Sequence, residues 1–460
     1  MNEINSLSNK TIEFVSNDNL VDVDINRKDK DGNTPLIVAC INNNENLIKH
    51  LVEAGANINI SDDDNDTPLI IMCKKENKQM IKYLYEHDAD INKQNKYGYS
   101  ALLISCFKDN EDITKYLIDK GAKINIKNTY GSTPLIAACS NENMAIVKYL
   151  INHGANINEI DEQNGNTPLI IACNKQNGKL VKYLVENGAK FNIGNNKGEC
   201  PITIACDHRN KSLIKCLVEH GLDINKEYHD KTPLMYVCYS RALNIVVEYL
   251  IEFGADANKA NGSGWTPIHY ACFKGNTEAI KILVDHGADI NKCCKRTDTP
   301  LIFSIKNKKY IYRYNFEVVE YLIEVGADVN KKSNDGYTPL IIAYQEKDQS
   351  LIEYLVDHGA DINQQDKNKN TPLIISCQNA DKKMIKYFVE HGANVNIRNK
   401  RGETSLSIAY KNKDEDIANY LIEHGADINT KDNHKSVSLY IIMATLVVVL
   451  SIFFAQNILY

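Results

Sequence analysis

The chain contains thirteen cysteines and twelve histidines, the residue types that most often bind metal ions, form disulfides or act as nucleophile and base. No C-x-x-C pair occurs, and Cys293-Cys294 lacks a matching pair of ligands. Nine cysteines occupy one slot, six residues after a recurring Thr-Pro-Leu or related tripeptide: Cys40, Cys73, Cys106, Cys139, Cys173, Cys206, Cys238, Cys272 and Cys377. We therefore expect reduced cysteines that pack in a core.

The histidines follow a similar rule. Seven of the twelve come directly before Gly or its substitute Asp88, where a second helix is expected to end: His87, His153, His220, His286, His358, His391 and His424. A hydrogen-bond donor at that point complements the free carbonyls of the helix. The chain has no phosphate-binding loop, no G-x-S-x-G, no H-E-x-x-H and no kinase signature. We expect no enzyme, no cofactor and no metal site.

The slots belong to an internal repeat. Twelve tripeptide anchors run from Thr34 to Thr404 at intervals of 32 to 34 residues, apart from 39 between Thr299 and Thr338. A fixed period near 33 indicates a stacked array in place of separate domains. Among the 460 residues 43% are hydrophobic, which excludes a disordered chain, and the net charge of -6 argues against general binding of nucleic acid.

One unit shows how the repeat is built. Thr34 is suited to cap a short helix, with Pro35 in its first position. Asn44 marks a turn and caps a second, amphipathic helix, which is expected to end at Gly55. Turn residues then predict an extended finger before the next anchor. Helices this short must bury their apolar faces against neighbouring units.

These motifs resemble those of the ankyrin-repeat family. The resemblance is carried by D-x-x-G-x-T-P-L at Asp31 to Leu36 and by the pattern at Leu421 to Asn429. It implies an all-α solenoid with a helix-turn-helix and a β-hairpin finger in each unit. Only His269 keeps the family's His after Thr-Pro-Leu, while Ile replaces it in most units, so we expect those junctions to be held more by packing. The expected segments are an N-terminal capping half-repeat (1–28), twelve repeats (29–433), a linker (434–436), a transmembrane helix (437–455) and a short non-cytosolic tail (456–460).

The transmembrane prediction rests on an apolar run without charged residues. Residues 437–455 would span roughly 28 Å as a helix, close to the ~30 Å hydrocarbon core. Lys431 and Lys435 precede the run, so the repeats are expected to face the cytosol of a tail-anchored membrane protein. The absence of basic residues after the run favours the endoplasmic reticulum or secretory system. The alternative is a helix that caps the last repeat.

Aromatic residues suggest where a protein partner binds. Five candidates fall at finger and first-helix positions of units seven and eight, which the ankyrin family uses for binding: Tyr236, Tyr239, Trp265, Tyr270 and Phe273. Trp and Tyr are favoured at interaction hot spots, although Tyr236 and Tyr270 also fit ordinary helix packing. The six extra residues of unit nine supply Tyr310, Tyr312 and Arg313, for which a longer, packed helix is the alternative.

Together these patterns predict a non-enzymatic, membrane-tethered scaffold that binds an unknown protein partner. We expect no nucleic acid and no small-molecule substrate. A regulatory or accessory subunit of a membrane assembly, and a substrate-recruiting adaptor, are the alternatives. The finger tips also differ in charge: Asp62-Asp63-Asp64 with Asp66 make an acidic finger, whereas Lys295-Arg296 and Arg398-Lys400-Arg401 make basic ones.

Overall fold

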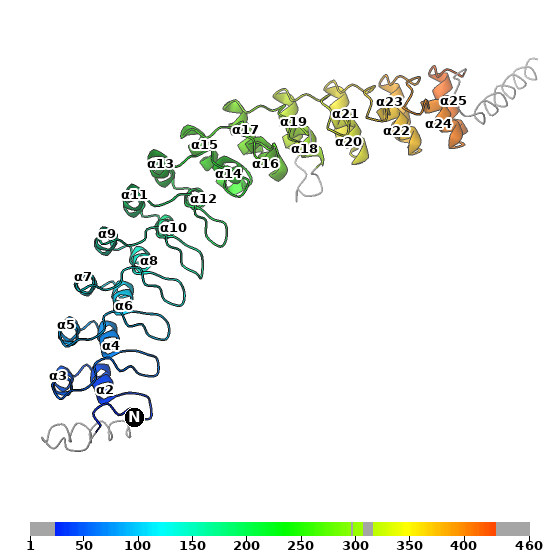
Figure 1. Cartoon of the computed structure of the whole chain (residues 1–460). Coiled ribbons are helices and arrows are strands. Elements are labelled where there is room, and N and C mark those ends of the chain that lie inside the picture. The colour runs from blue at the N-terminus through cyan, green and yellow to red at the C-terminus, as the bar shows by residue number, and fades with distance from the viewer. Residues whose placement is uncertain (1–23, 296–297, 307–315, 429–460) are drawn as a thin grey trace, which may run out of the picture. The chain divides into compact units, whose positions relative to one another are not determined.

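The computed structural model describes residues 24–295, 298–306 and 316–428 and divides into two compact units, residues 1–224 and 225–460. The described part of each unit contains six helical hairpins. Within each unit the hairpins follow one another in chain order, with the first helices in one row and the second helices in another (Figure 1). The expected all-helical ankyrin architecture is confirmed.

In the unit 1–224 the first helices are α2 (Pro35–Ile41), α4 (Pro68–Lys75), α6 (Ala101–Phe107), α8 (Pro134–Ser140), α10 (Pro168–Asn174) and α12 (Pro201–Asp207). The second helices are α3 (Glu45–Glu53), α5 (Lys78–Glu86), α7 (Glu111–Asp119), α9 (Met144–Asn152), α11 (Gly178–Glu186) and α13 (Lys211–Glu219).

In the unit 225–460 the first helices are α14 (Pro233–Cys238), α16 (Pro267–Lys274), α18 (Pro300–Lys306), α20 (Pro339–Gln345), α22 (Pro372–Gln378) and α24 (Ser405–Lys411). The second helices are α15 (Asn244–Glu252), α17 (Thr277–Asp285), α19 (Phe316–Glu324), α21 (Gln349–Asp357), α23 (Lys382–Glu390) and α25 (Glu415–Glu423). A short 3-10 helix, η1 (Arg241–Leu243), precedes α15.

Local sequence explains where these helices begin. Thr67 precedes α4, and its hydroxyl accepts a hydrogen bond from the backbone N–H of Ile70 at 3.3 Å, with Pro68 in the first helical position. Asn77 caps α5 in the same way, and its side-chain amide also donates to Glu45 of the preceding repeat at 2.8 Å. The predicted Thr and Asn caps are therefore confirmed, and the Asn cap also links neighbouring repeats.

The core is a series of small layers between neighbouring first helices. Helix α4 packs between α2 and α6, and its residues from Pro68 to Cys73 are all buried. The second helices bury one stripe only; in α5 this stripe is Met80, Ile81 and Leu84. A first helix with no polar face needs neighbours on both sides, which explains why the fold is an array.

The fingers differ from the expected β-hairpins. Within the described residues they contain no strands and only two isolated bridges, Gln94 with Ser100 and Tyr228 with Lys231. Neighbouring fingers are joined by single backbone hydrogen bonds, such as the one from Lys96 N–H to the Asp64 carbonyl at 2.9 Å. Gly98 has a positive φ, and a side chain there would lie 2.7 Å from the backbone of Asn128 in the next finger. This close stacking favours tight turns over paired strands.

In most described repeats one asparagine near the end joins the repeat to the next. In the clearest cases its Nδ2 donates to the carbonyl of the residue that follows the C-cap of the next second helix, while its Oδ1 accepts a backbone N–H two residues later. For Asn258 these bonds reach Gly287 at 2.8 Å and Asp289 at 2.7 Å. We call this series the asparagine ladder; its members include Asn26, Asn59, Asn92, Asn125, Asn158, Asn225, Asn258, Asn291, Asn330, Asn363 and Asn396.

The ladder continues across the longest repeat. Asn291 donates to the Gly326 carbonyl at 3.3 Å and accepts the Asp328 N–H at 2.8 Å. These partners are 35 and 37 residues away, where the other members typically span 29 and 31. The additional residues therefore fall between α18 and α19. The segment 307–315, with Tyr310, Tyr312 and Arg313, lies outside the described residues.

Two terminal predictions fall largely outside the described part of the chain. They are the N-terminal capping half-repeat, of which only residues 24–28 are described, and the span 437–455 with its flanking segments. Across residues 24–295, 298–306 and 316–428, no helix is both long and apolar enough to cross a bilayer.

The ladder gives a direct test of inter-repeat coupling. Asn258→Ala removes two hydrogen bonds, and we expect the free energy of unfolding to fall by about 1–2 kcal/mol. Amide hydrogen exchange at Gly287 to Asp289 should accelerate more than exchange in distant repeats. The matched control is Lys259→Ala on the same finger, which should leave both quantities nearly unchanged; equal effects of the two substitutions would contradict the role of the ladder.

Candidate functional site

The repeated cysteines lie in the core. All nine are buried, and none of the described cysteines forms a disulfide. Burial raises the pKa of the Cys40 thiol to about 12 and likewise raises that of Cys73 and Cys139. Thiols held protonated at neutral pH are poor nucleophiles, which agrees with the predicted packing role. In the described residues no group of three His, Cys, Asp or Glu side chains is placed to hold a metal ion.

The repeated histidines end the second helices, as predicted. His153 is the C-cap of α9, and its Nδ1 forms a hydrogen bond of 2.8 Å with the carbonyl of Tyr149 one turn earlier. The two rings stack with centroids 4.4 Å apart. The same Tyr-His pair recurs at His358 and His391. These histidines therefore cap the C-terminal ends of the second helices.

Five aromatic rings come together in repeats seven to nine. Trp265 lies edge-on to Phe303 at 4.6 Å and to Tyr270 at 5.2 Å, measured between ring centroids. Phe273 lies 6.2 Å from Trp265 and stacks on Tyr239 at 5.9 Å. We call Tyr239, Trp265, Tyr270, Phe273 and Phe303 the aromatic cluster. It joins α14, α16, α18 and the finger before α16 into one surface.

Two lysines lie against this surface. The Lys274 Nζ is 3.9 Å from the ring centroid of Tyr239. Lys231 Nζ is 5.0 Å from Tyr239 and 5.8 Å from Tyr270. Such cation–π contacts contribute about 0.5–1 kcal/mol each at exposed sites. The cluster therefore combines apolar area with positive charge, a combination suited to a partner segment that carries apolar and acidic side chains.

The members of the cluster differ in exposure. Tyr270 is buried, with 5% of its surface exposed, and its hydroxyl accepts a hydrogen bond from Asn261 at 3.0 Å. Burial raises the pKa of this hydroxyl to about 12. Trp265 is half-buried and packs on Phe303 of the next repeat. Tyr239 is 38% exposed and offers the most accessible ring.

One predicted candidate of repeats seven and eight is not part of the cluster, and one member of the cluster was not predicted. Tyr236 lies half-buried on α14. Phe303 was not among the sequence candidates, yet it is the ring closest to Trp265. Its position, four residues after the anchor Thr299, is the slot that Tyr236 and Tyr270 occupy in repeats seven and eight, so a slot-by-slot comparison of the repeats would have found it. The structure thus brings together four of the five predicted residues of repeats seven and eight.

A second aromatic group lies in repeat three and was not among the candidates predicted from the sequence. Tyr99 and Phe107 have ring centroids 5.6 Å apart. They occupy the repeat slots that Trp265 and Phe273 occupy in repeat eight. Phe107 is 41% exposed, and the finger tips add the exposed Tyr97 (45%) and Tyr130 (48%). Comparing repeats slot by slot would have found this pair.

His269 stabilises the junction between a finger and a helix. Its Nδ1 lies 2.8 Å from the Thr266 hydroxyl and accepts the Thr266 backbone N–H at 3.2 Å. Its Nε2 lies 3.3 Å from the Asp298 carbonyl in the next repeat. Burial lowers the pKa of this ring to about 4. In repeats with Ile, the Thr hydroxyl caps the helix instead, as Thr133 does for Ile136 at 3.2 Å.

The lowered pKa of His269 predicts acid sensitivity. Between pH 6.5 and about 4 the unfolded chain binds a proton that the folded chain does not, so stability falls as the pH falls through this window. The loss should reach about 3 kcal/mol at most. Urea unfolding of the wild-type chain and of His269→Ile across this range should show a smaller pH dependence for the variant; equal slopes would contradict this assignment.

Comparisons with known proteins identify what this chain is similar to. A family model described as ankyrin repeats (3 copies) matches residues 6–62, 42–128, 102–195, 176–261, 244–333, 293–366 and 344–432. Among solved structures, the ankyrin repeat domain of Bcl-3, a member of the IkappaB family, is 24% identical with a TM-score of 0.43, covering 49% of this chain and 99% of that domain. The human ASB11 ankyrin repeat domain is 25% identical with a TM-score of 0.39, covering 50% and 99%. No curated protein matches the chain. Because the family matches extend over most of the sequence, the chain belongs to the ankyrin-repeat family.

Proposed function

We propose that this chain is a non-enzymatic scaffold that recruits a protein partner through the aromatic cluster and is tethered to a membrane by residues 437–455. Ankyrin repeats in general suggest protein–protein interaction. The aromatic cluster is the observation that carries the proposal for this chain. Its rings come from three successive repeats, so a partner that covers it contacts several repeats at once.

The composition of the cluster supports protein binding. Interaction hot spots are enriched in Trp and Tyr that sit in packed surroundings, because such residues bring large apolar area at little cost in side-chain entropy. Trp265 is held from two sides by Tyr270 and Phe303 and is therefore preorganised. The accessible Tyr239 ring and the Lys274 ammonium extend the surface toward solvent.

The proposed tether rests on the apolar run alone. Residues 437–455 have the length and apolarity of a transmembrane helix, and Lys431 and Lys435 precede them. With this polarity the repeats face the cytosol, and the endoplasmic reticulum or secretory system is the proposed membrane. Tethering would raise the local concentration of a bound partner at the bilayer surface.

The cluster can be tested by photo-crosslinking. A photoreactive benzoylphenylalanine in place of Tyr239 should capture one protein that the same substitution at Tyr249, on α15 of the same repeat, does not capture. Trp265→Ala and Tyr239→Ala should each weaken binding of that protein about tenfold or more. Tyr249→Ala is the matched control and should leave binding nearly unchanged.

The single Trp provides a second readout. Since Trp265 is the only Trp in the chain, its fluorescence reports directly on the cluster. Bound partner should protect it from acrylamide quenching. Capture that is equal at Tyr239 and Tyr249, together with unchanged quenching, would contradict the proposed site.

Membrane tethering is tested by extraction at alkaline pH. The full-length chain should remain with the membrane pellet, because a spanning helix is held by its apolar area and not by charge. A chain ending at residue 433 should appear in the supernatant. Release of the full-length chain by alkaline carbonate would contradict the transmembrane proposal.

A further inference from the structure

A polar hollow lies in repeats eleven and twelve, apart from the aromatic cluster. It encloses about 440 Å³ between α22, α24 and the fingers that precede them. Nine of its ten lining residues are polar or charged, and Ile408 is the exception. Small-molecule pockets are lined mostly by apolar side chains. This lining therefore favours a polar, extended ligand. We call the hollow the amide groove.

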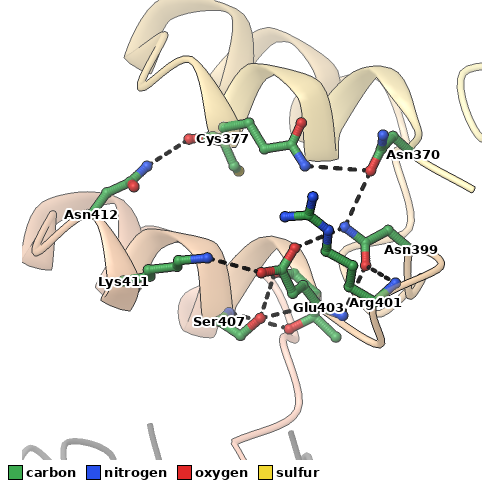
Figure 2. Close-up of polar contacts among 10 residues, drawn as sticks. Asn370, Cys377, Asn399, Arg401, Glu403, Ser407, Lys411 and Asn412 are labelled. Carbon is green, nitrogen blue, oxygen red and sulfur yellow. Dashed lines mark hydrogen bonds and ion pairs between the residues drawn. The ribbon is translucent and has the colours of Figure 1, made fainter. Parts of the chain in front are cut away.

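The floor of the groove is held by buried amides. Asn399 Nδ2 donates to Asn370 Oδ1 at 3.2 Å and to Glu403 Oε2 at 3.0 Å (Figure 2). Asn399 Oδ1 accepts the backbone N–H groups of Arg401 and Glu403 at 2.9 and 3.0 Å. Asn370 and Asn399 are 8% and 6% exposed. This network fixes the finger that carries Arg401, so the groove is preorganised.

Two of the three cationic side chains that line the groove remain available to a ligand. The hydrogen bond from Asn399 and that from Lys411, at 3.1 Å, hold the pKa of Glu403 below its ordinary value, with Arg401 contributing through its charge. Glu403 is therefore an anion already matched by Lys411. Lys400 and Arg401 are exposed, and neither side chain forms a hydrogen bond or ion pair with another described residue.

The rim adds groups that match a peptide backbone. Asn412 donates its Nδ2 to the Cys377 carbonyl at 2.8 Å (Figure 2), which fixes the side chain while its amide oxygen remains able to accept. Asn368 places a second exposed amide on the neighbouring finger. Amide side chains both donate and accept hydrogen bonds, as peptide groups do.

From this arrangement we propose that the amide groove binds an acidic, extended segment of a partner protein. Arg401, whose fork of N–H donors matches a carboxylate, and Lys400 bind Asp or Glu side chains. The amides of Asn368 and Asn412 bind the intervening backbone. Charge complementarity selects an acidic segment, since the lining holds three cations and a single anion. This surface is additional to the aromatic cluster and does not depend on it.

The test uses a fluorescein-labelled ten-residue peptide of alternating Glu and Gly, a Lys-Gly peptide as control, and the full-length chain in nonionic detergent. Fluorescence anisotropy should detect the Glu-Gly peptide only, with affinity that falls as salt rises. Arg401→Glu should raise Kd about 10- to 100-fold, the range expected for loss of a charged hydrogen bond. Lys383→Glu, the same charge change on α23, should alter Kd less than about twofold.

The outcomes separate the two proposals. Trp265→Ala should bind the Glu-Gly peptide like the wild type. A negative result for the aromatic cluster therefore would not contradict the proposal for the amide groove. Absence of peptide binding, or equal weakening by Arg401→Glu and Lys383→Glu, would overturn the groove. So would loss of binding to phosphatidylserine vesicles in Arg401→Glu with peptide binding unchanged, since the surface would then serve a membrane. Circular dichroism of Arg401→Glu should match the wild type, because Arg401 is an exposed finger residue.

Discussion

In most described repeats the side chain of one asparagine forms hydrogen bonds to the backbone of the next repeat, and this link holds neighbouring repeats in register. At Asn330 the bonds reach the Gly359 carbonyl at 3.0 Å and the Asp361 N–H at 2.7 Å. They satisfy a carbonyl at a helix end and an N–H of the following loop, groups that have no partner within their own repeat. Each bond adds only about 1 kcal/mol, but the ladder fixes the register in which apolar layers meet. Finger positions, and with them both proposed binding surfaces, follow from that register.

Much of this fold could be predicted because its determinants are local. Thr-Pro at a helix start, Asn at the next cap and Gly at the helix end act over three or four residues, and the structure places them where the sequence indicated. The expected β-hairpins were wrong for a physical reason. Each finger stacks so closely on the next that a side chain at Gly98 would lie 2.7 Å from the backbone of Asn128. The bonds within a finger only close a tight turn, as from Asn95 N–H to the Tyr99 carbonyl at 3.0 Å, and do not extend into strands.

Features that depend on contacts between repeats were harder to predict. Asp66 was counted among the charges of an acidic finger, yet it is 5% exposed and pairs with Lys74 of the following helix and Asn95 of the next finger. Phe303 became part of the aromatic cluster only because α18 packs beside α16. The amide groove combines two fingers and two helices, and only the Arg398-Lys400-Arg401 finger had been noted from the sequence. In each case the partner lies in another repeat or another element.

The bonds of Asn291 show that the connection between the two helices of a hairpin can change in length while neighbouring repeats stay joined. The distance along the chain from one ladder asparagine to its partner can grow from 29 to 35 residues while the bond is retained. Added residues between the two helices of a hairpin therefore do not disturb the alignment of neighbouring repeats. In evolutionary terms this connection is a permissive site, where a loop can lengthen and acquire new side chains without any compensating change in the stack. For protein engineering, the same connection is the natural place to graft a foreign segment into this chain.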